Sequence, residues 1–226
     1  MPGPRRTSAT RKAKASSNRG APRTQTPDLR RRELMDAGER ILLRKGFAST
    51  TIDDVTRAAG VAKGTYYLYF KSKDDLAAAL RDRFIEDCRK RIETLSARRP
   101  ANDWRGRLDA WVEGGICHYL DHLELHDIIF IAGHEGHGSM AQSALVEALA
   151  DLIRAGAAAG AWRAQSPELV SLFLFYALHG VVDHIVTSRT MDRRGVIRLS
   201  QKIVRDVMGV SPESAARRIL KHSSAR

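Results

Sequence analysis

The stretch that decides the fold is residues 50–73, TTIDDVTRAAGVAKGTYYLYFKSK. Two short helical segments meet in it at a glycine, and the first has clear signals for its start. Thr51 with Asp54, and Thr50 with Asp53, both match the capping box, in which an acid follows a hydroxyl residue three positions later. A bracing helix, a turn that contains glycine and a second short helix are typical of a helix-turn-helix.

The second helix of this motif carries side chains that can contact DNA. If it begins at Val61, Tyr66 points back at the first helix and Tyr67 faces away from it. Gly64 leaves room for a close approach of DNA, and Lys73 can hold a phosphate together with the free amides of the next helix. The alternative is an ordinary helical hairpin whose tyrosines pack inward. The candidate DNA contacts are Thr50, Thr51, Lys63, Gly64, Thr65, Tyr67, Tyr69 and Lys73.

The positive charge of the chain lies mostly outside its middle. The 226 residues carry a formal net charge of +12. Residues 1–27 hold seven Lys and Arg and no acid, whereas residues 75–210 hold seventeen basic and eighteen acidic residues. This distribution predicts a polyanionic partner such as double-stranded DNA.

Composition and periodicity divide the chain into four parts. Residues 1–27 are rich in Pro, Ser and Arg and lack periodicity, so we interpret them as a disordered basic arm. Residues 28–74 form the predicted helix-turn-helix domain, with Asp28 as the cap of its first helix. Residues 75–210 form a larger domain, and residues 211–226 a basic C-terminal tail.

Several classes of protein are disfavoured. Cys88 and Cys117 lie inside helical patterns and match neither a disulfide framework nor zinc-finger spacing, which favours a cytoplasmic location. The longest nearly apolar run, residues 169–182, is too short to span a bilayer, so no membrane partner is expected. The chain has no Gly-rich phosphate loop, nucleophile elbow or HExxH motif, so we predict neither an enzyme nor a cofactor.

The rest of the chain shows helical periodicity and no strand pattern, which predicts an all-α fold. A fourth helix over residues 73–97 is long enough to link the first domain to the second. A loop is predicted at residues 133–138. The remaining predicted helices cover residues 102–121, 125–132, 139–159, 166–189 and 195–207.

Residues 47–76 match a known pattern, carried by Gly46-Phe47, Thr51, Ala58-Ala59-Gly60-Val61, Gly64-Thr65, Tyr66-Tyr67, Tyr69-Phe70 and Lys73-Asp74-Asp75-Leu76. This pattern resembles the N-terminal domain of the TetR (tetracycline-repressor) family of transcriptional regulators. The resemblance implies about nine helices, a homodimer and an effector pocket in the second domain. It also implies that Thr51, Tyr67 and Lys73 contact phosphates and that Lys63 approaches bases.

In this family the last two long helices form the dimer interface. Residues 169–182 are apolar on more sides than a monomer of this size easily covers, which favours a partner surface. A fully buried core helix is the alternative. A dimer would supply the two-fold symmetry that a palindromic operator requires.

An effector pocket needs apolar lining with a few polar groups. Polar candidates inside helical patterns include His126 and His184, and aromatic candidates include Trp104, Tyr119 and Phe173. The selected ligand-contact candidates are Trp111, His118, His122, Phe130, Tyr176, His179 and Asp183. Histidines in such positions are more often structural than ligand-binding.

A metal-responsive regulator remains an alternative. His118 and His122, and likewise His179 and Asp183, are four residues apart, and a further pair of histidines lies at residues 134–137. Imidazoles and carboxylates suit zinc, nickel or copper. Spacing alone fixes no set of three ligands, so no metal is predicted.

The leading hypothesis is a one-component, ligand-responsive repressor. The effector would favour a state in which the two DNA-binding domains of a dimer are separated differently, with residues 76–95 coupling the two sites. The second hypothesis is a non-specific, architectural nucleic-acid binder whose basic arm follows phosphates or enters a minor groove.

Overall fold

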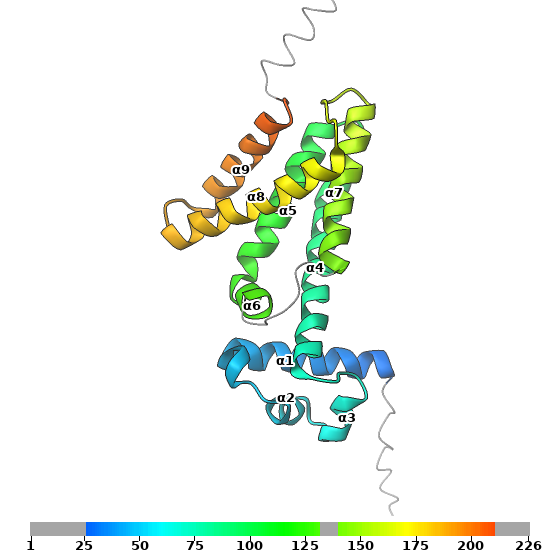
Figure 1. Ribbon diagram of the computed structural model, residues 1–226, viewed down its shortest axis with the longest axis vertical. Coiled ribbons are helices and arrows are strands. Elements are labelled where there is room, and N and C mark those ends of the chain that lie inside the picture. The colour runs from blue at the N-terminus through cyan, green and yellow to red at the C-terminus, as the bar shows by residue number, and fades with distance from the viewer. Residues whose placement is uncertain (1–25, 132–139, 211–226) are drawn as a thin grey trace, which may run out of the picture.

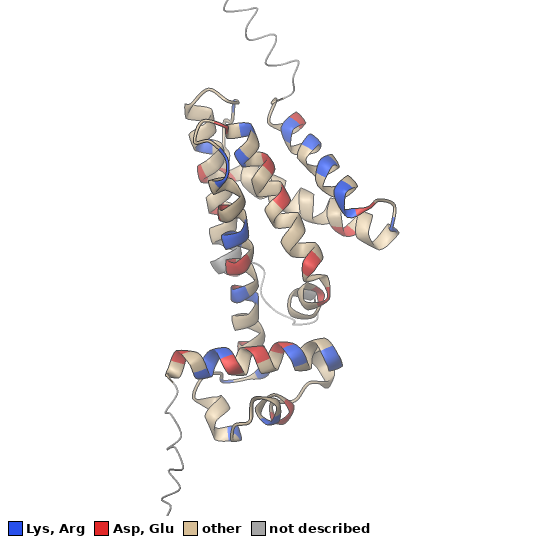
Figure 2. Ribbon diagram, turned by 180° about the vertical axis from the view of Figure 1, so that it is seen from behind, with Lys and Arg blue, Asp and Glu red and all other residues tan. Residues whose placement is uncertain are grey.

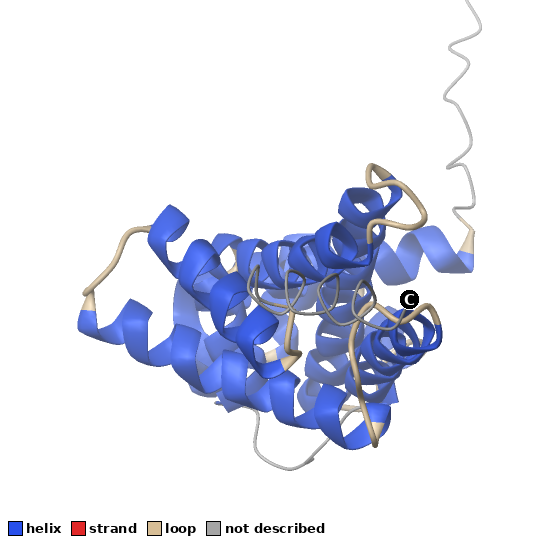
Figure 3. Ribbon diagram, turned by 90° about the horizontal axis from the view of Figure 1, so that it is seen from above, coloured by secondary structure: helices blue, strands red, loops and turns tan. Residues whose placement is uncertain are grey.

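The computed structural model describes residues 26–131 and 140–210, and every regular element in this part of the chain is helical (Figures 1 and 3). These residues form nine α-helices and one five-residue π-helix. The prediction of an all-α fold with about nine helices is therefore confirmed. The arm up to residue 25, the loop predicted at residues 133–138 and the tail from residue 211 lie outside the described residues.

Three helices form a small unit, called the head below, at one end of the molecule: α1 (Pro27–Ser49), α2 (Ile52–Ala59) and α3 (Lys63–Tyr67) (Figure 1). The head closes around Tyr66 and Phe70, whose side chains are buried together with Val55 of α2. The Tyr66 hydroxyl donates a hydrogen bond to the Ser72 carbonyl at 2.8 Å, so the polar tip of this tyrosine is satisfied. The inward position expected for Tyr66 is thus confirmed.

The long helix α4 (Lys73–Ala97) leaves the head and runs into the rest of the molecule (Figure 1). Its bounds are those predicted from the sequence. Ser72 caps it, because the Ser72 hydroxyl accepts a hydrogen bond from the Asp75 amide at 3.1 Å. One stripe of α4 is buried: Leu76, Leu80, Phe84, Cys88 and Ile92.

The remaining helices form the body, which packs around the second half of α4. Helix α5 lies against α4 and α9, and α7 lies against α4 and α8. Buried apolar residues from all of these helices form a core that is continuous with the core of the head. The elements are α5 (Trp104–Asp121), α6 (Leu123–His126), the π-helix (Asp127–Ile131), α7 (Met140–Ala158), α8 (Pro167–Ser188) and α9 (Arg193–Val207).

Helix α8 combines high hydropathy with an exposed apolar face. It has 22 residues and a window of mean hydropathy 1.8, only 28% of which is buried. Helix α8 is long and apolar enough to cross a membrane, so the prediction that this apolar segment is too short to do so is corrected, although one such helix is weak evidence for a membrane. Its exposed large residues follow helical spacing: Leu169, Leu172, Phe173 and Tyr176.

Some helix ends differ from the sequence predictions. The N-cap of α1 is Thr26 and not Asp28, because Pro27 occupies the first helical position, where its missing N–H costs nothing. The stop predicted at Gly46 is a kink, at which φ is 73° and the helix then continues for three residues. Helix α3 begins at Lys63 rather than Val61. The helix expected over residues 125–132 is split into α6 and the π-helix.

Candidate DNA interface and effector cavity

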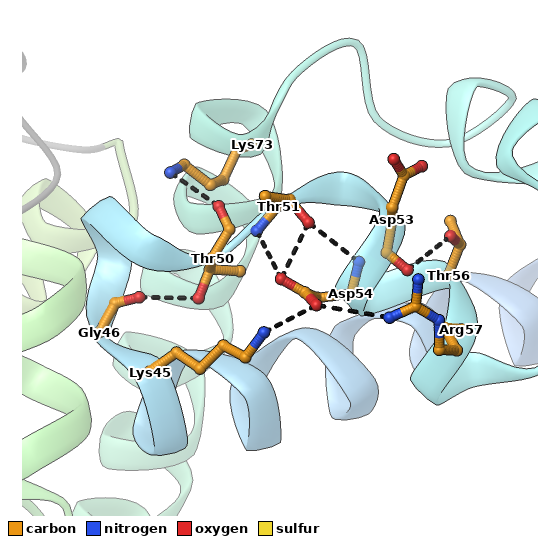
Figure 4. Close-up of polar contacts among 9 residues, drawn as sticks. All are labelled: Lys45, Gly46, Thr50, Thr51, Asp53, Asp54, Thr56, Arg57 and Lys73. Carbon is orange, nitrogen blue, oxygen red and sulfur yellow. Dashed lines mark hydrogen bonds and ion pairs between the residues drawn. The ribbon is translucent and has the colours of Figure 1, made fainter.

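The start of α2 is fixed by the Thr51–Asp54 capping box (Figure 4). The Thr51 hydroxyl accepts a hydrogen bond from the Asp54 amide at 3.2 Å, and the Asp54 carboxylate accepts one from the Thr51 amide at 3.1 Å. Lys45 of α1 approaches the same carboxylate at 2.8 Å. Hydrogen bonds from Lys45 and Thr51 lower the pKa of Asp54 to about 2. Because the Thr51 hydroxyl also donates to Asp54 at 2.9 Å, its polar groups are engaged in the cap.

The alternative capping residue, Thr50, has a different position. Its side chain is buried, and its hydroxyl donates to the Gly46 carbonyl at 2.7 Å (Figure 4). It closes the kinked end of α1 and does not cap α2. Thr50 therefore has a structural role in this conformation, and its contact with DNA stays a prediction.

Lys73 also turns inward. Its ammonium lies 2.6 Å from the Phe47 carbonyl oxygen and 3.0 Å from that of Thr50, and it sits 4.4 Å from the centre of the Phe47 ring. These contacts tie the start of α4 to the carbonyl groups at the end of α1, where positive charge is favoured. In this conformation the Lys73 ammonium is used within the head, which competes with the predicted phosphate contact.

Helix α3 holds four of the candidate DNA contacts, of which Lys63, Gly64 and Tyr67 are exposed and Thr65 is half-buried. The Tyr67 side chain is 50% exposed, although it is the chain neighbour of the fully buried Tyr66. Lys63 forms an exposed ion pair with Asp53 at 3.0 Å, and that carboxylate raises the pKa of the lysine above its usual value. Lys63 therefore remains charged at neutral pH, near the surface that α3 presents.

The fold itself does not require a glycine at position 64. A Cβ added there would meet no other atom within 4 Å, and its backbone is not in the left-handed region. An exposed glycine inside a helix is unfavourable by about 0.5–1 kcal/mol relative to alanine. A small residue here is useful for close approach by another molecule. By contrast, Tyr69 is half-buried and packs against the core.

The body holds a cavity of about 450 Å³, partly open to solvent, between α4, α5, α7, α8 and the α6–π-helix segment. Five of the seven selected ligand candidates line it. Its lining also includes Tyr119 and His126, which the sequence placed in wider candidate sets, and four residues of α4, which were not among the ligand candidates. The described lining comprises Phe84, Ile85, Cys88, Ile92, Trp111, Val112, Gly115, Ile116, Tyr119, His126, Phe130, Leu145, Phe175, Tyr176, Leu178, His179, Gly180, Val182 and Asp183.

The two remaining ligand candidates, His118 and His122, are not among the described lining residues. The His118 ring packs 4.4 Å from that of Phe84, and burial lowers the pKa of His118 to about 4. The Nδ1 atom of His122 lies 3.0 Å from the carbonyl oxygen of His118. His118 is buried against α4, whereas His122 is exposed at the end of α5. The predicted ligand contacts of these two histidines stay predictions.

The polar groups of the cavity gather at one end. The Tyr119 hydroxyl donates to the Asp183 carboxylate at 3.3 Å. The rings of His126 and His179 are 4.9 Å apart, and His126 stacks on Phe130 at 4.7 Å. Burial lowers the pKa values of both histidines, so their rings are neutral at pH 7.

The described residues contain no group of three side chains placed to hold a metal ion. The pairs His118–His122 and His179–Asp183 do not combine into such a group. The histidines at residues 134 and 137 lie outside the described residues.

The α6–π-helix segment connects the cavity wall to the head. Phe130 lines the cavity, and the neighbouring Ile129 is fully buried. The Arg81 guanidinium of α4 donates to the Ile129 carbonyl at 2.8 Å. The π-helix also contacts α1, and Arg83 pairs with Asp36 of α1 at 2.6 Å. Figure 2 shows that charges of both signs alternate along α1, where such pairs form.

Residues 34–80 match the family model described as "Bacterial regulatory proteins, tetR family". The chain is 32% identical over 108 residues to the HTH-type transcriptional regulator EthR of Mycobacterium tuberculosis, covering 45% of this chain and 49% of that one. It is 27% identical over 92 residues to the HTH-type transcriptional repressor NemR of Escherichia coli, covering 41% and 46%. The match thus spans about half the length of these curated relatives.

The fold also matches solved structures. One is the transcriptional regulator FadR of Bacillus subtilis in complex with stearoyl-CoA, with a TM-score of 0.63 and 16% sequence identity. The match covers 80% of this chain and 98% of that one, so the similarity extends through the body as well as the head.

Proposed function

Because the chain belongs to the TetR family of bacterial transcriptional regulators, we propose that it acts as a homodimeric, one-component repressor in the cytoplasm. In this proposal, the head binds a palindromic DNA operator, and a small molecule in the body cavity releases it. The observation that carries the proposal is the α6–π-helix segment, which lines the cavity with Phe130 and contacts both α1 of the head and the linking helix α4.

The head would read DNA with the exposed face of α3. In a helix-turn-helix, the second helix enters the major groove and its neighbours contact phosphates. Lys63, Thr65 and Tyr67 can reach base edges or phosphate oxygens from this face, and Gly64 allows the close approach. Thr50, Thr51 and Lys73 would instead hold α2 and α4 in position to support α3, because their polar groups are occupied within the head.

The dimer would form through α8 and α9. Leu169 and Phe173 of α8 are 66% and 61% exposed, which is costly for large apolar side chains at regular helical spacing. A second copy of the chain would cover this face by a two-fold contact. Two heads would then sit on successive major grooves, about 34–36 Å apart.

The effector would act by a difference in affinity for two states of the dimer. A ligand against Phe130 would move the π-helix or hold it in place. Because Arg81 of α4 is hydrogen-bonded to the Ile129 carbonyl of the π-helix, a shift of the π-helix would also move the first half of α4. Helix α4 sets the position of the head through Lys73 and through the Arg83–Asp36 pair. A shift of α4 would therefore change the distance between the two heads of the dimer and, with it, the affinity for the operator.

The first experiment is selection of bound fragments from random duplexes with the full chain, followed by a ligand screen for release. The proposal predicts a palindromic site, two chains per duplex, and a ligand that lowers affinity for that site. A selected sequence without two-fold symmetry, or binding by a single chain, would contradict the proposal that the chain binds its operator as a dimer.

The high positive charge of residues 1–27 supports the architectural alternative, so its test is deletion of residues 1–25. This deletion keeps Thr26 and Pro27, which begin α1. A repressor should keep its site preference and show a shallower dependence on salt, since each lost phosphate contact changes the slope by about 0.9. An architectural binder should lose nearly all affinity.

A further inference from the structure

The cavity in the body is lined mostly by apolar residues, and the chemistry of this lining indicates which class of effector it can bind. Most of its described lining is aliphatic or aromatic, contributed by α4, α5, α7 and α8. No described lining residue is Lys or Arg. The cavity volume of about 450 Å³ suits a drug-sized molecule, whose apolar part would fill this lining.

The single anionic group of the described lining is Asp183 of α8. Its Oδ1 atom accepts a hydrogen bond from the Tyr119 hydroxyl at 3.3 Å, and among the described residues Asp183 forms no salt bridge to Lys or Arg. Asp183 is exposed, so water also reaches this carboxylate, which has about four lone-pair sites. A positively charged donor in the cavity would give it an ionic partner.

The two imidazoles at this end do not supply it. His126 contacts His179 at 4.9 Å between ring centres, and its Nδ1 atom already lies 3.1 Å from the Asp127 carboxylate. Both rings are neutral at pH 7 for the reason given above. A carboxylate-ended ligand would therefore meet Asp183 with no described cation to offset the repulsion.

The aromatic residues beside Asp183 add a second attraction. Tyr119, Phe130 and Tyr176 line the same cavity, and aromatic faces attract cations. Trp111 is buried in this wall, and its indole N–H has no acceptor among the described residues. A heteroatom in the body of a ligand would give that N–H a partner.

We infer that the cavity binds a lipophilic amine, with its ammonium group at Asp183 and its apolar body against the aliphatic and aromatic lining, and that it discriminates against carboxylate-ended acyl chains. The inference rests on the proposed function, because it assigns the chemical class of the effector at the same site.

The test uses three probes that share a phenylhexyl chain and differ only in the terminal group: 6-phenylhexylamine, 6-phenylhexan-1-ol and 6-phenylhexanoate. Their affinities for the full chain are measured by calorimetry at pH 7. We expect the amine to bind at least tenfold more tightly than the alcohol, and the carboxylate to bind most weakly. In the Asp183→Asn variant the amine and alcohol should bind within about twofold of each other, with the alcohol unchanged.

A matched control is Glu147→Gln, which removes one exposed carboxylate from α7 outside the described lining. It should keep the ranking of the unmodified chain. The inference is overturned if the carboxylate binds as tightly as the amine, or if Asp183→Asn keeps the preference for the amine. The ranking on the unmodified chain decides the matter even if the Asp183 variant fails to fold.

The same probes separate this inference from the proposed function. Operator affinity is measured with the amine at saturation. An amine that binds with the expected preference but leaves operator affinity unchanged supports the ligand class and contradicts ligand-controlled release. Release by the carboxylate, without any preference for the amine, supports the repressor and overturns the ligand class.

Discussion

Replacing Lys73 by methionine tests whether this residue supports the head from within. The change keeps most of the aliphatic stem but removes the ammonium, which lies 2.6 Å and 3.0 Å from the carbonyl oxygens of Phe47 and Thr50. Hydrogen bonds to charged groups contribute about 1.5–3 kcal/mol each, and partial exposure places these two at about 1 kcal/mol each. The contact with the Phe47 ring adds about 0.5–1 kcal/mol.

The expected loss in the free energy of unfolding is therefore about 2–3 kcal/mol. In a chain of this size it corresponds to a fall in Tm of roughly 5–10 °C. Urea and thermal unfolding would measure it, at one fixed protein concentration because the stability of a dimer depends on concentration. Lys71→Met is the matched control, since Lys71 is an exposed lysine two residues away. Its effect should stay within about 0.5 kcal/mol.

The result that refutes this reasoning is equal stability for the Lys73 and Lys71 variants. If Lys73→Met left unfolding unchanged but reduced the salt dependence of operator binding by about one phosphate contact, the lysine would serve DNA directly.

Four further changes test separate parts of the structure. Gly64→Ala should leave the free energy of unfolding unchanged or raise it by up to about 1 kcal/mol. The same change should weaken operator binding at least tenfold, as measured by fluorescence anisotropy. Unchanged operator affinity would show that DNA does not approach this position closely. Asp54 has a pKa of about 2 in the folded chain, below the usual carboxyl value, so its stabilisation is complete above about pH 4 and is lost as pH falls towards 2. Acid unfolding of Asp54→Asn should accordingly lack this component, and identical curves would contradict the assignment. Arg81→Met leaves the buried Ile129 carbonyl without its partner and should cost about 1–3 kcal/mol in urea unfolding. Arg83→Met removes only partly exposed ion pairs and should cost less than about 1 kcal/mol.

The head could be predicted closely because its signals are local. The Thr51–Asp54 box, the glycine turn and the opposite orientations of Tyr66 and Tyr67 all depend on residues a few positions apart. The role of Lys73 was not accessible in this way. Its partners at the end of α1 are 23 and 26 residues earlier in the chain, so only the packing of α1 against α4 brings them together.

The kinds of residue that line the cavity were predictable from the sequence, but only some of the individual lining residues were. Trp111, Phe130 and His179 line it as expected, whereas His118 faces α4. Helical spacing groups residues on one face but does not tell which neighbouring helix that face meets. The contribution of α4, including Phe84, was missed because a buried stripe on a connecting helix looks the same whether it meets solid core or a cavity wall.

The most direct test of the central claim is operator binding by the double variant Lys63→Ala/Tyr67→Ala, measured by anisotropy on the selected palindrome. Both side chains are exposed on α3, so the fold should be unaffected. Two lost contacts of about 1–3 kcal/mol each predict at least a 30-fold loss of affinity. Arg163→Ala, which removes an exposed charge between α7 and α8, should bind as the unmodified chain does. A double variant that binds the palindrome with undiminished affinity would contradict the claim that α3 reads DNA.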